Sequence, residues 1–118
     1  MATVFVVEDD PELREALTYL LEYHGYRVDG AANGREALDY LRRETAPCVI
    51  LLDLMMPVMD GWEFREAQLG DPALASIPTV VVSAFSRRDE AAERIRANAF
   101  LAKPIDPEAL LATVGRYC

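Results

Sequence analysis

Five polar side chains of this sequence each stand at the end of an apolar stretch: Glu8, Asp9, Asp53, Ser83 and Lys103. Carboxylates, a hydroxyl and an ammonium are the groups that phosphoryl transfer uses, with a carboxylate as nucleophile and cationic groups around the transferring oxygens. Asp53 is the candidate nucleophile, because it follows the apolar residues 48–52 and a buried carboxylate needs a partner or a purpose. In this scheme Lys103 neutralises the phosphoryl oxygens, and Ser83 donates a hydrogen bond to them.

Three of these side chains also predict a divalent cation. The carboxylates of Glu8, Asp9 and Asp53 would repel one another at a shared site unless a cation lay between them. Oxygen ligands suit Mg²⁺, or Mn²⁺ in its place. A nucleotide site is not expected, since neither G-x-G-x-x-G nor G-x-x-x-x-G-K-[ST] occurs in the chain.

The placement of these side chains depends on strands and helices that alternate along the chain. Apolar residues predict five strands: residues 3–7, 26–29, 48–52, 77–83 and 99–102. Capping residues and apolar residues at helical spacing predict five helices, which begin at Pro11, after the cap Asn33, and at Gly61, Arg87 and Pro107. Asp10 precedes Pro11 and is assigned to the N-cap of the first helix rather than to the acidic cluster.

This alternation predicts an α/β protein with a doubly wound parallel sheet, for which a common strand order is 2-1-3-4-5. Ligands of such sheets bind outside the carboxyl ends of the strands, at the switch point between strands 1 and 3. The five polar side chains are therefore expected to meet at one edge of the sheet. Within residues 87–97, Ile95 is the only large apolar residue, so this helix is expected to be short and weakly held.

Composition limits the classes of function. The 118 residues suffice for one domain, residues 1–118, but not for an additional sensing or DNA-binding domain, so the protein is expected to act through partners. A net charge of −8 disfavours direct binding to nucleic acid or to anionic membranes. No apolar run reaches the ~18 residues of a transmembrane helix, and the first residues do not resemble a secretory signal, so a cytoplasmic location is expected.

The two cysteines show no motif spacing. Cys48 is expected to be a small core residue at the start of a strand, and Cys118 is expected to be an exposed free thiol. Neither a disulfide nor a metal site is expected from them.

Four groups of residues resemble the receiver domain of bacterial two-component response regulators, including the chemotaxis regulators: residues 6–11 (VVEDDP), 52–61 (LDLMMPVMDG), 82–84 (VSA) and 100–104 (FLAKP). The resemblance covers essentially the whole chain. It implies a single flavodoxin-like (βα)5 domain with the five-stranded parallel order given above.

The resemblance also implies a role for individual residues. Asp53 matches the phosphoacceptor, Lys103 the active-site lysine, Ser83 the Ser/Thr switch and Phe100 the aromatic switch. Mg²⁺ would be held by Asp9, Asp53 and the backbone carbonyl of Met55, with Glu8 acting through water. The bond between Lys103 and Pro104 matches a position that is commonly cis.

A sensor histidine kinase, a histidine phosphotransfer protein or a small donor such as acetyl phosphate is the implied phosphoryl source. Phosphorylation would reshape the surface made by helix 4, strand 5 and helix 5, which would then bind a downstream effector protein. Such a protein catalyses only its own phosphorylation and dephosphorylation and is not a metabolic enzyme. A monomer or a weak dimer is expected.

The chain departs from the family pattern before its fifth strand. A Gly-Ala pair is usual there, whereas this chain has the residues RANA at 96–99. Asn98 is the residue expected to adopt the left-handed backbone conformation that the glycine would supply.

Two other classes of function remain open at this point. One is a Mg²⁺-dependent phosphatase with an aspartyl nucleophile, which requires a second Asp two residues after the nucleophile, where this chain has Met55. The other is a receiver-like scaffold that binds partners without being phosphorylated.

Overall fold

Five parallel strands form the centre of a computed structural model that describes residues 2–84 and 95–118. The strands are β1 (Thr3–Val7), β2 (Arg27–Ala31), β3 (Val49–Leu52), β4 (Thr79–Ser83) and β5 (Ala99–Ala102). Their order is β2-β1-β3-β4-β5, and each neighbouring pair is parallel. The predicted order is confirmed. β4 begins later than expected because Pro78 has no N–H to donate to the sheet.

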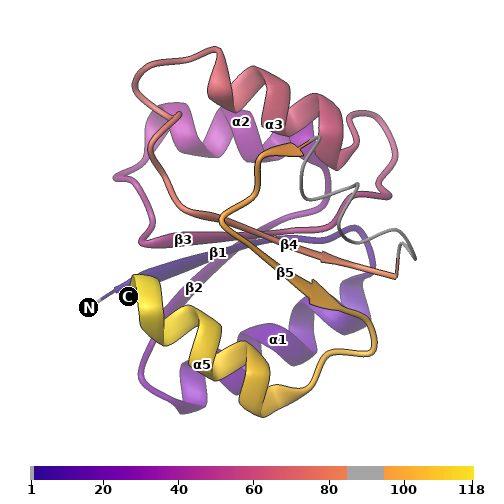
Figure 1. The fold of residues 1–118 in the computed structure, drawn as a ribbon, viewed down its shortest axis with the longest axis vertical. Coiled ribbons are helices and arrows are strands. Elements are labelled where there is room, and N and C mark those ends of the chain that lie inside the picture. Colours follow the sequence, from indigo (N-terminus) through magenta and orange to yellow (C-terminus); the bar gives the residue numbers. More distant parts are fainter. Residues whose placement is uncertain (1, 85–94) are drawn as a thin grey trace.

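Helices cover both faces of this sheet. They are α1 (Pro11–Tyr23), α2 (Gly34–Arg43), α3 (Gly61–Leu69) and α5 (Pro107–Tyr117). Figure 1 shows α2 and α3 on one face and α1 and α5 on the other. The helix expected over residues 87–97 falls largely outside the described part of the chain, which resumes at Ile95. Among the helices of residues 2–84 and 95–118, none is long and apolar enough to cross a membrane.

Each described helix begins at a side chain that caps it. Asp10, Asn33, Asp60 and Asp106 all accept a hydrogen bond from a backbone N–H in the first turn of the following helix. Such caps satisfy N–H groups that have no partner within the helix, typically stabilising it by about 1 kcal/mol. Asp10 is therefore a helix cap, as expected from the sequence.

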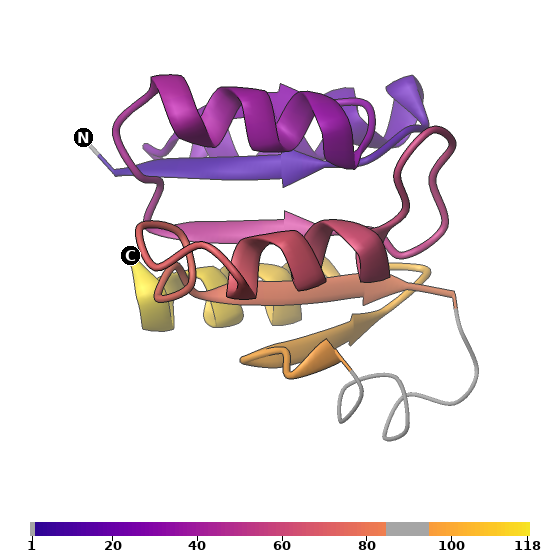
Figure 2. The ribbon, with the colours of Figure 1, turned by 90° about the horizontal axis from the view of Figure 1, so that it is seen from above.

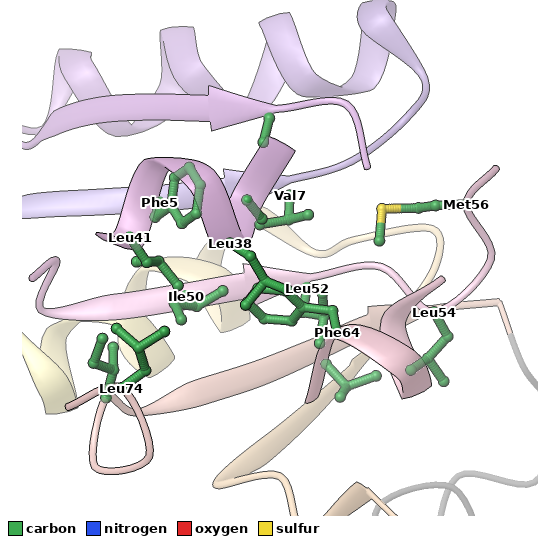
Figure 3. Close-up of a cluster of buried hydrophobic side chains, with 14 of the residues drawn as sticks. Phe5, Val7, Leu38, Leu41, Ile50, Leu52, Leu54, Met56, Phe64 and Leu74 are labelled. Carbon is green, nitrogen blue, oxygen red and sulfur yellow. The ribbon is translucent and has the colours of Figure 1, made fainter. Parts of the chain in front are cut away.

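Alternate residues of the central strands pack into two cores. Phe5, Ile50 and Leu52 face α2 and α3, where Phe64 is fully buried between them (Figure 3). On the opposite face, the neighbouring valines and leucines of the strands pack against α1 and α5. Burying each large side chain stabilises the fold by about 1.5–3 kcal/mol, so β1, β3 and β4 can hold polar groups at their ends with little freedom to move.

The two cysteines form a disulfide, so the expectation of two separate thiols was wrong. Cys48 precedes β3 and Cys118 follows α5, and their Cα atoms lie 5.4 Å apart. The two residues are 70 positions apart in the chain, so no local spacing indicates the bond. The doubly wound topology brings them together, because α5 runs back to the edge where the strands begin (Figure 2).

The left-handed residue before β5 is Arg96, with φ of 55°, and the expectation for Asn98 was wrong. Asn98 instead pairs with the start of β4. Its backbone N–H donates to the Thr79 carbonyl at 2.8 Å, and its side-chain oxygen accepts from the Thr79 N–H at 2.8 Å. Both bonds require Asn98 to lie alongside the start of β4, and the positive φ falls on Arg96 instead.

Candidate functional site

The backbone of the sheet carries the predicted site residues to one edge. The Asp53 N–H donates to the Val7 carbonyl at 3.0 Å, and the Lys103 N–H donates to the Ser83 carbonyl at 3.0 Å. Each bond continues the pairing of two parallel strands by one residue beyond their ends. Because these backbone bonds hold the residues that follow β3 and β5, the side chains of Asp53 and Lys103 lie at the same edge.

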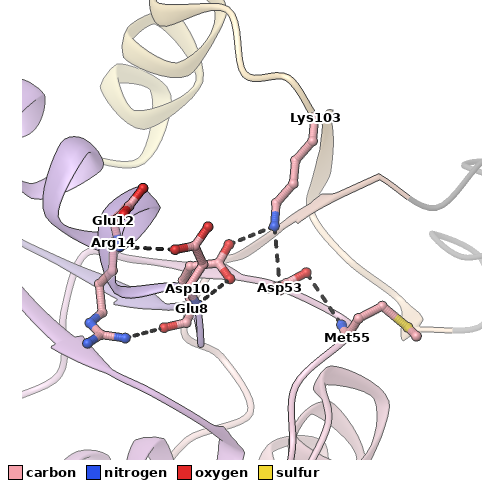
Figure 4. Close-up of polar contacts among 7 residues, drawn as sticks. All are labelled: Glu8, Asp10, Glu12, Arg14, Asp53, Met55 and Lys103. Atoms are coloured by element: carbon pink, nitrogen blue, oxygen red, sulfur yellow. Dashed lines mark hydrogen bonds and ion pairs between the residues drawn. The ribbon is translucent and has the colours of Figure 1, made fainter.

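A lysine lies between two nearly buried carboxylates at this edge (Figure 4). The Lys103 Nζ is 2.7 Å from Glu8 Oε1 and 3.5 Å from Asp53 Oδ2. Glu8 is 2% exposed and Asp53 is 5% exposed. Burial alone lowers the pKa of Lys103, but the hydrogen bond to Glu8 and the charges of Asp53 and Glu8 outweigh it and hold this pKa above its ordinary value.

Backbone and side-chain contacts orient these acids further. Glu8 Oε2 accepts a hydrogen bond from the Asp10 N–H at 3.2 Å, and the Glu8 carbonyl accepts one from Arg14 Nη1 at 2.6 Å. Asp53 Oδ1 accepts from the Met55 N–H at 3.4 Å. Arg14 was not singled out from the sequence, since it lies six residues from its acceptor in the following helix.

Negative charge exceeds positive charge in this cluster. One carboxylate oxygen from each of Glu8, Asp9 and Asp53 lies within 4.8 Å of the others, and Lys103 is the ammonium beside them. Burial and the neighbouring Glu8 carboxylate raise the pKa of Asp9 above its ordinary value of 3.8. Three hard oxygen donors with excess negative charge fit a divalent cation such as Mg²⁺.

A cavity of about 420 Å³ opens over the cluster. Its lining comprises Glu8, Asp9, Asp10, Asp53, Met55, Ser83, Ala84 and Lys103. Ser83 is buried at its base, whereas Met55 is 65% exposed at its rim. The cavity therefore gives a small anion access to Asp53 and to the hydroxyl and ammonium groups beside it.

Gly61 allows the loop between β3 and α3 to close behind Asp53. Any Cβ at this position would overlap the Asp53 carbonyl oxygen and lie 2.7 Å from the Leu54 Cα. The Gly61 N–H donates to the Leu54 carbonyl at 3.0 Å. The glycine at the end of the sequence motif thus has a steric role, because the backbone at residues 53 and 54 passes too close for a side chain at position 61.

The two switch candidates lie at different depths. Ser83 is 1% exposed and ends β4, while Phe100 is half-buried and packs against the core that faces α2 and α3. The peptide bond between Lys103 and Pro104 is cis, as expected from the sequence motif.

Arg65 on α3 was missed by sequence reasoning. It is 5% exposed and donates to the carbonyls of Ile95 at 3.0 Å and Arg96 at 2.6 Å. It also donates to the side-chain oxygens of Gln68 at 2.8 Å and Thr79 at 3.1 Å. Burial lowers the pKa of Arg65. The signal available in the sequence was an arginine next to Phe64 on the inward side of α3.

Five parallel strands in the order 2-1-3-4-5, with an acidic cluster and a lysine at their carboxyl ends, are the features of a flavodoxin-like receiver domain. The sequence profile of the response regulator receiver domain matches residues 4–115. The chain belongs to this family and is a receiver domain of two-component signalling.

Individual relatives agree with this assignment. The response regulator Rre1 of Synechocystis is 37% identical, with a match that covers 95% of this chain and 49% of Rre1. Protein PilH of Pseudomonas aeruginosa is 33% identical, over 98% of this chain and 96% of PilH. The structure of the response regulator TrrA from Thermotoga maritima, in complex with Mg²⁺-BeF, is 27% identical with a TM-score of 0.86 and covers 100% of both chains.

Proposed function

We propose that this protein is a phosphoacceptor that relays a signal by accepting a phosphoryl group on Asp53. The observation that carries the proposal is the position of the Lys103 ammonium, between Glu8 and Asp53 beside an open cavity. A single buried ion pair would need no third carboxylate and no cavity. The complex of the relative TrrA with Mg²⁺-BeF supports the proposal that Asp53 is a phosphoacceptor.

The reaction proposed is an in-line transfer. A carboxylate oxygen of Asp53 attacks the phosphorus of the donor, while the bond from phosphorus to the donor nitrogen or oxygen breaks and its electron pair leaves with the donor. Lys103 and the Ser83 hydroxyl stabilise the phosphoryl oxygens as negative charge develops on them. Mg²⁺, or Mn²⁺, held by Asp9, Asp53 and the Met55 carbonyl with Glu8 acting through water, would supply further charge neutralisation.

The same groups supply the response to phosphorylation. A phosphoryl group adds about −1.5 to −2 charges at neutral pH, and this charge competes with Glu8 for the Lys103 ammonium. Ser83 is drawn to the phosphoryl oxygens, and Phe100 then turns inward behind it. The surface that includes β5 and α5 then changes and binds an effector protein.

Partners are proposed from the surface around the site. Receiver domains of two-component systems interact with histidine kinases and with effectors. An apolar groove of about 370 Å³ between α1 and α5 is lined by Leu13, Leu17 and Leu110 and reaches Lys103. We assign this groove to the helix of a sensor histidine kinase or of a histidine phosphotransfer protein, which would bring its phosphohistidine to the cavity.

The remaining properties follow from this role. Residues 1–118 form one receiver domain, which acts in the cytoplasm as a monomer or a weak dimer without direct contact to nucleic acid or membrane. It catalyses only its own phosphorylation and dephosphorylation. A phosphatase is disfavoured because Met55 replaces the required acid and points its exposed side chain to the rim of the cavity.

Incubation with acetyl phosphate and Mg²⁺ tests the proposal. Intact-mass measurement should find one added phosphoryl group on the wild type and on Asp39→Asn, whose carboxylate is exposed on α2. Asp53→Asn should give no adduct, and EDTA should suppress the adduct on the wild type because the acidic cluster then lacks its cation. Absence of an adduct with acetyl phosphate, phosphoramidate and several histidine kinases would favour the phosphorylation-independent scaffold.

A further inference from the structure

The disulfide lies at the edge of the sheet opposite the acidic cluster. β3 runs from Val49 to Leu52, so Cys48 and Asp53 flank its two ends. Five residues of a strand span about 16 Å. Figures 1 and 2 both show the end of α5 on the side where the strands begin, away from their carboxyl ends. Chemistry at the two sulfurs is therefore separate from chemistry at Asp53.

Both cysteines are held in place by their backbones. The Cys48 N–H donates to the Thr3 carbonyl at 2.9 Å, and the Cys118 N–H donates to the Val114 carbonyl at 3.0 Å. Their Cα separation of 5.4 Å lies within the usual range for a disulfide, about 4.4–6.8 Å. The folded chain therefore brings the two sulfurs within bonding distance without a rearrangement of the backbone.

Packing holds the last turn of α5 on one side only. Leu110 and Val114 bury one side of the helix, but Gly115 and Arg116 are exposed. A Cβ at Gly115 would meet no atom within 4 Å, so this turn has no packing there, and glycine weakens a helix interior. Tyr117 packs against the core, and its hydroxyl donates a hydrogen bond of 3.4 Å to the carbonyl of Asn98, the residue before β5. The disulfide is the covalent attachment of this turn.

We propose that Cys48 and Cys118 are a redox modification site, which exchanges electrons with small thiols and disulfides and thereby locks or releases the last turn of α5. Cys118 is exposed, whereas Cys48 is half-buried against the core. Exchange therefore begins at Cys118, because an incoming reagent reaches its sulfur first.

The chemistry balances as follows. In oxidation, the Cys118 thiolate attacks a small disulfide, RSSR, and expels one thiolate to form a mixed disulfide. The Cys48 thiolate then attacks the Cys118 sulfur and expels the second thiolate. The two cysteines together lose two protons and two electrons, and RSSR becomes two RSH. Reduction by a small thiol runs the same steps in reverse.

Through the redox state of the two cysteines, this site can change a surface that phosphorylation is also proposed to change. α5 belongs to the proposed effector surface, so locking its last turn would change the surface that an effector meets; this consequence rests on the proposed function. The exchange itself does not, since neither sulfur touches the acidic cluster. The redox site can therefore be tested in a protein that carries Asp53→Asn.

Thiol counting tests the bond. The full chain is equilibrated with oxidised or with reduced dithiothreitol, treated with iodoacetamide under denaturing conditions and weighed. The expected result is no carbamidomethyl group on the oxidised protein, two on the reduced protein, and full return to none after reoxidation. Two labelled thiols in the oxidised buffer, or a bond between two chains instead of within one, would overturn the proposal.

Amide hydrogen exchange tests the release of α5. Reduction should speed exchange of the amides of residues 114–118 by about tenfold or more, because the last turn then opens locally. Cys118→Ser and Cys48→Ser should show the fast rate in both buffers, and Ala112→Ser, which keeps both sulfurs, should behave as the wild type. Equal rates in both buffers for the wild type would overturn the switch. Asp53→Asn should show the same dependence on the redox buffer. Because this variant lacks the proposed phosphoacceptor, the result does not depend on whether phosphorylation occurs.

Discussion

At the scale of single residues, one ammonium organises the site. Lys103 contacts both Glu8 and Asp53, so it places a positive charge beside two carboxyl groups that are almost completely buried. Asp9 is more exposed and adds a third negative charge that Lys103 balances only partly. The free protein therefore carries unfavourable charge repulsion in this cluster, which a divalent cation or the loss of one carboxylate would relieve.

Asp9→Asn should accordingly raise stability at neutral pH in the absence of divalent cations. The pKa of Asp9 is raised in the folded protein. Its protonated carboxyl group therefore favours the folded state below the ordinary pKa of 3.8, and this contribution to stability is lost as pH rises through the folded-state pKa. We expect a gain of no more than about 0.5 kcal/mol in the free energy of unfolding, since solvent screens this half-exposed group. Urea unfolding at pH 7 with EDTA measures it.

Two changes of condition check the cause of this gain. Below the ordinary carboxyl pKa the variant and the wild type should converge, and with Mg²⁺ the wild type should gain more stability because it binds the ion more tightly. Asp39→Asn serves as the control for removing an exposed charge. A variant less stable than the wild type at pH 7 in EDTA would contradict the account.

At the scale of elements, α3 holds the chain that leads into β5. Arg65 donates four hydrogen bonds to neutral acceptors, two of them the carbonyls of Ile95 and Arg96. Arg96 has a left-handed backbone, which costs a residue other than glycine about 1–2 kcal/mol. The Arg65 guanidinium thus helps to offset the strain of a left-handed residue that is not glycine.

Arg65→Leu should lower the free energy of unfolding by about 2 kcal/mol, because the buried carbonyls lose their donor. Arg96→Gly should raise it by about 1 kcal/mol in the wild type, since glycine adopts a positive φ without strain. In the Arg65→Leu background Arg96→Gly should recover about half of the loss. Chemical denaturation of the four proteins measures these values, with the exposed Arg42→Leu as control. If Arg65→Leu lost no more stability than Arg42→Leu does, this role for Arg65 would be excluded.

At the scale of the whole molecule, the disulfide closes a large part of the chain. Cys48 and Cys118 are 70 residues apart, and their bond connects the middle of the sheet to the last helix. A cross-link of this span restricts the unfolded chain far more than the folded one. The bond should therefore stabilise the fold as a whole in addition to holding α5.

Reduction of this disulfide should lower the free energy of unfolding by about 4 kcal/mol, the chain-entropy value for a loop of this length. Urea unfolding with and without dithiothreitol measures the difference. Cys118→Ser should match the reduced wild type and be insensitive to dithiothreitol. Identical transition midpoints in the two buffers would show that the bond does not stabilise the folded protein.

The sequence by itself determined the order of the strands, the starts of the four described helices and the edge at which the acids meet. These depend on local signals: apolar stretches long enough for a strand, and caps such as Asp10 and Asn33 directly before their helices. Parallel topology then requires the residues after each strand to share one edge, so Asp53 and Lys103 could be placed together without coordinates.

Only the tertiary structure decided the contacts between segments that are distant in the chain. Cys48 meets Cys118 across 70 residues, and Arg65 on α3 meets the carbonyls of Ile95 and Arg96, 30 and 31 residues later. No periodicity or spacing encodes such pairs, because each depends on how helices pack across the sheet. For the same reason the left-handed residue before β5 is Arg96, where a guanidinium from another element holds the backbone.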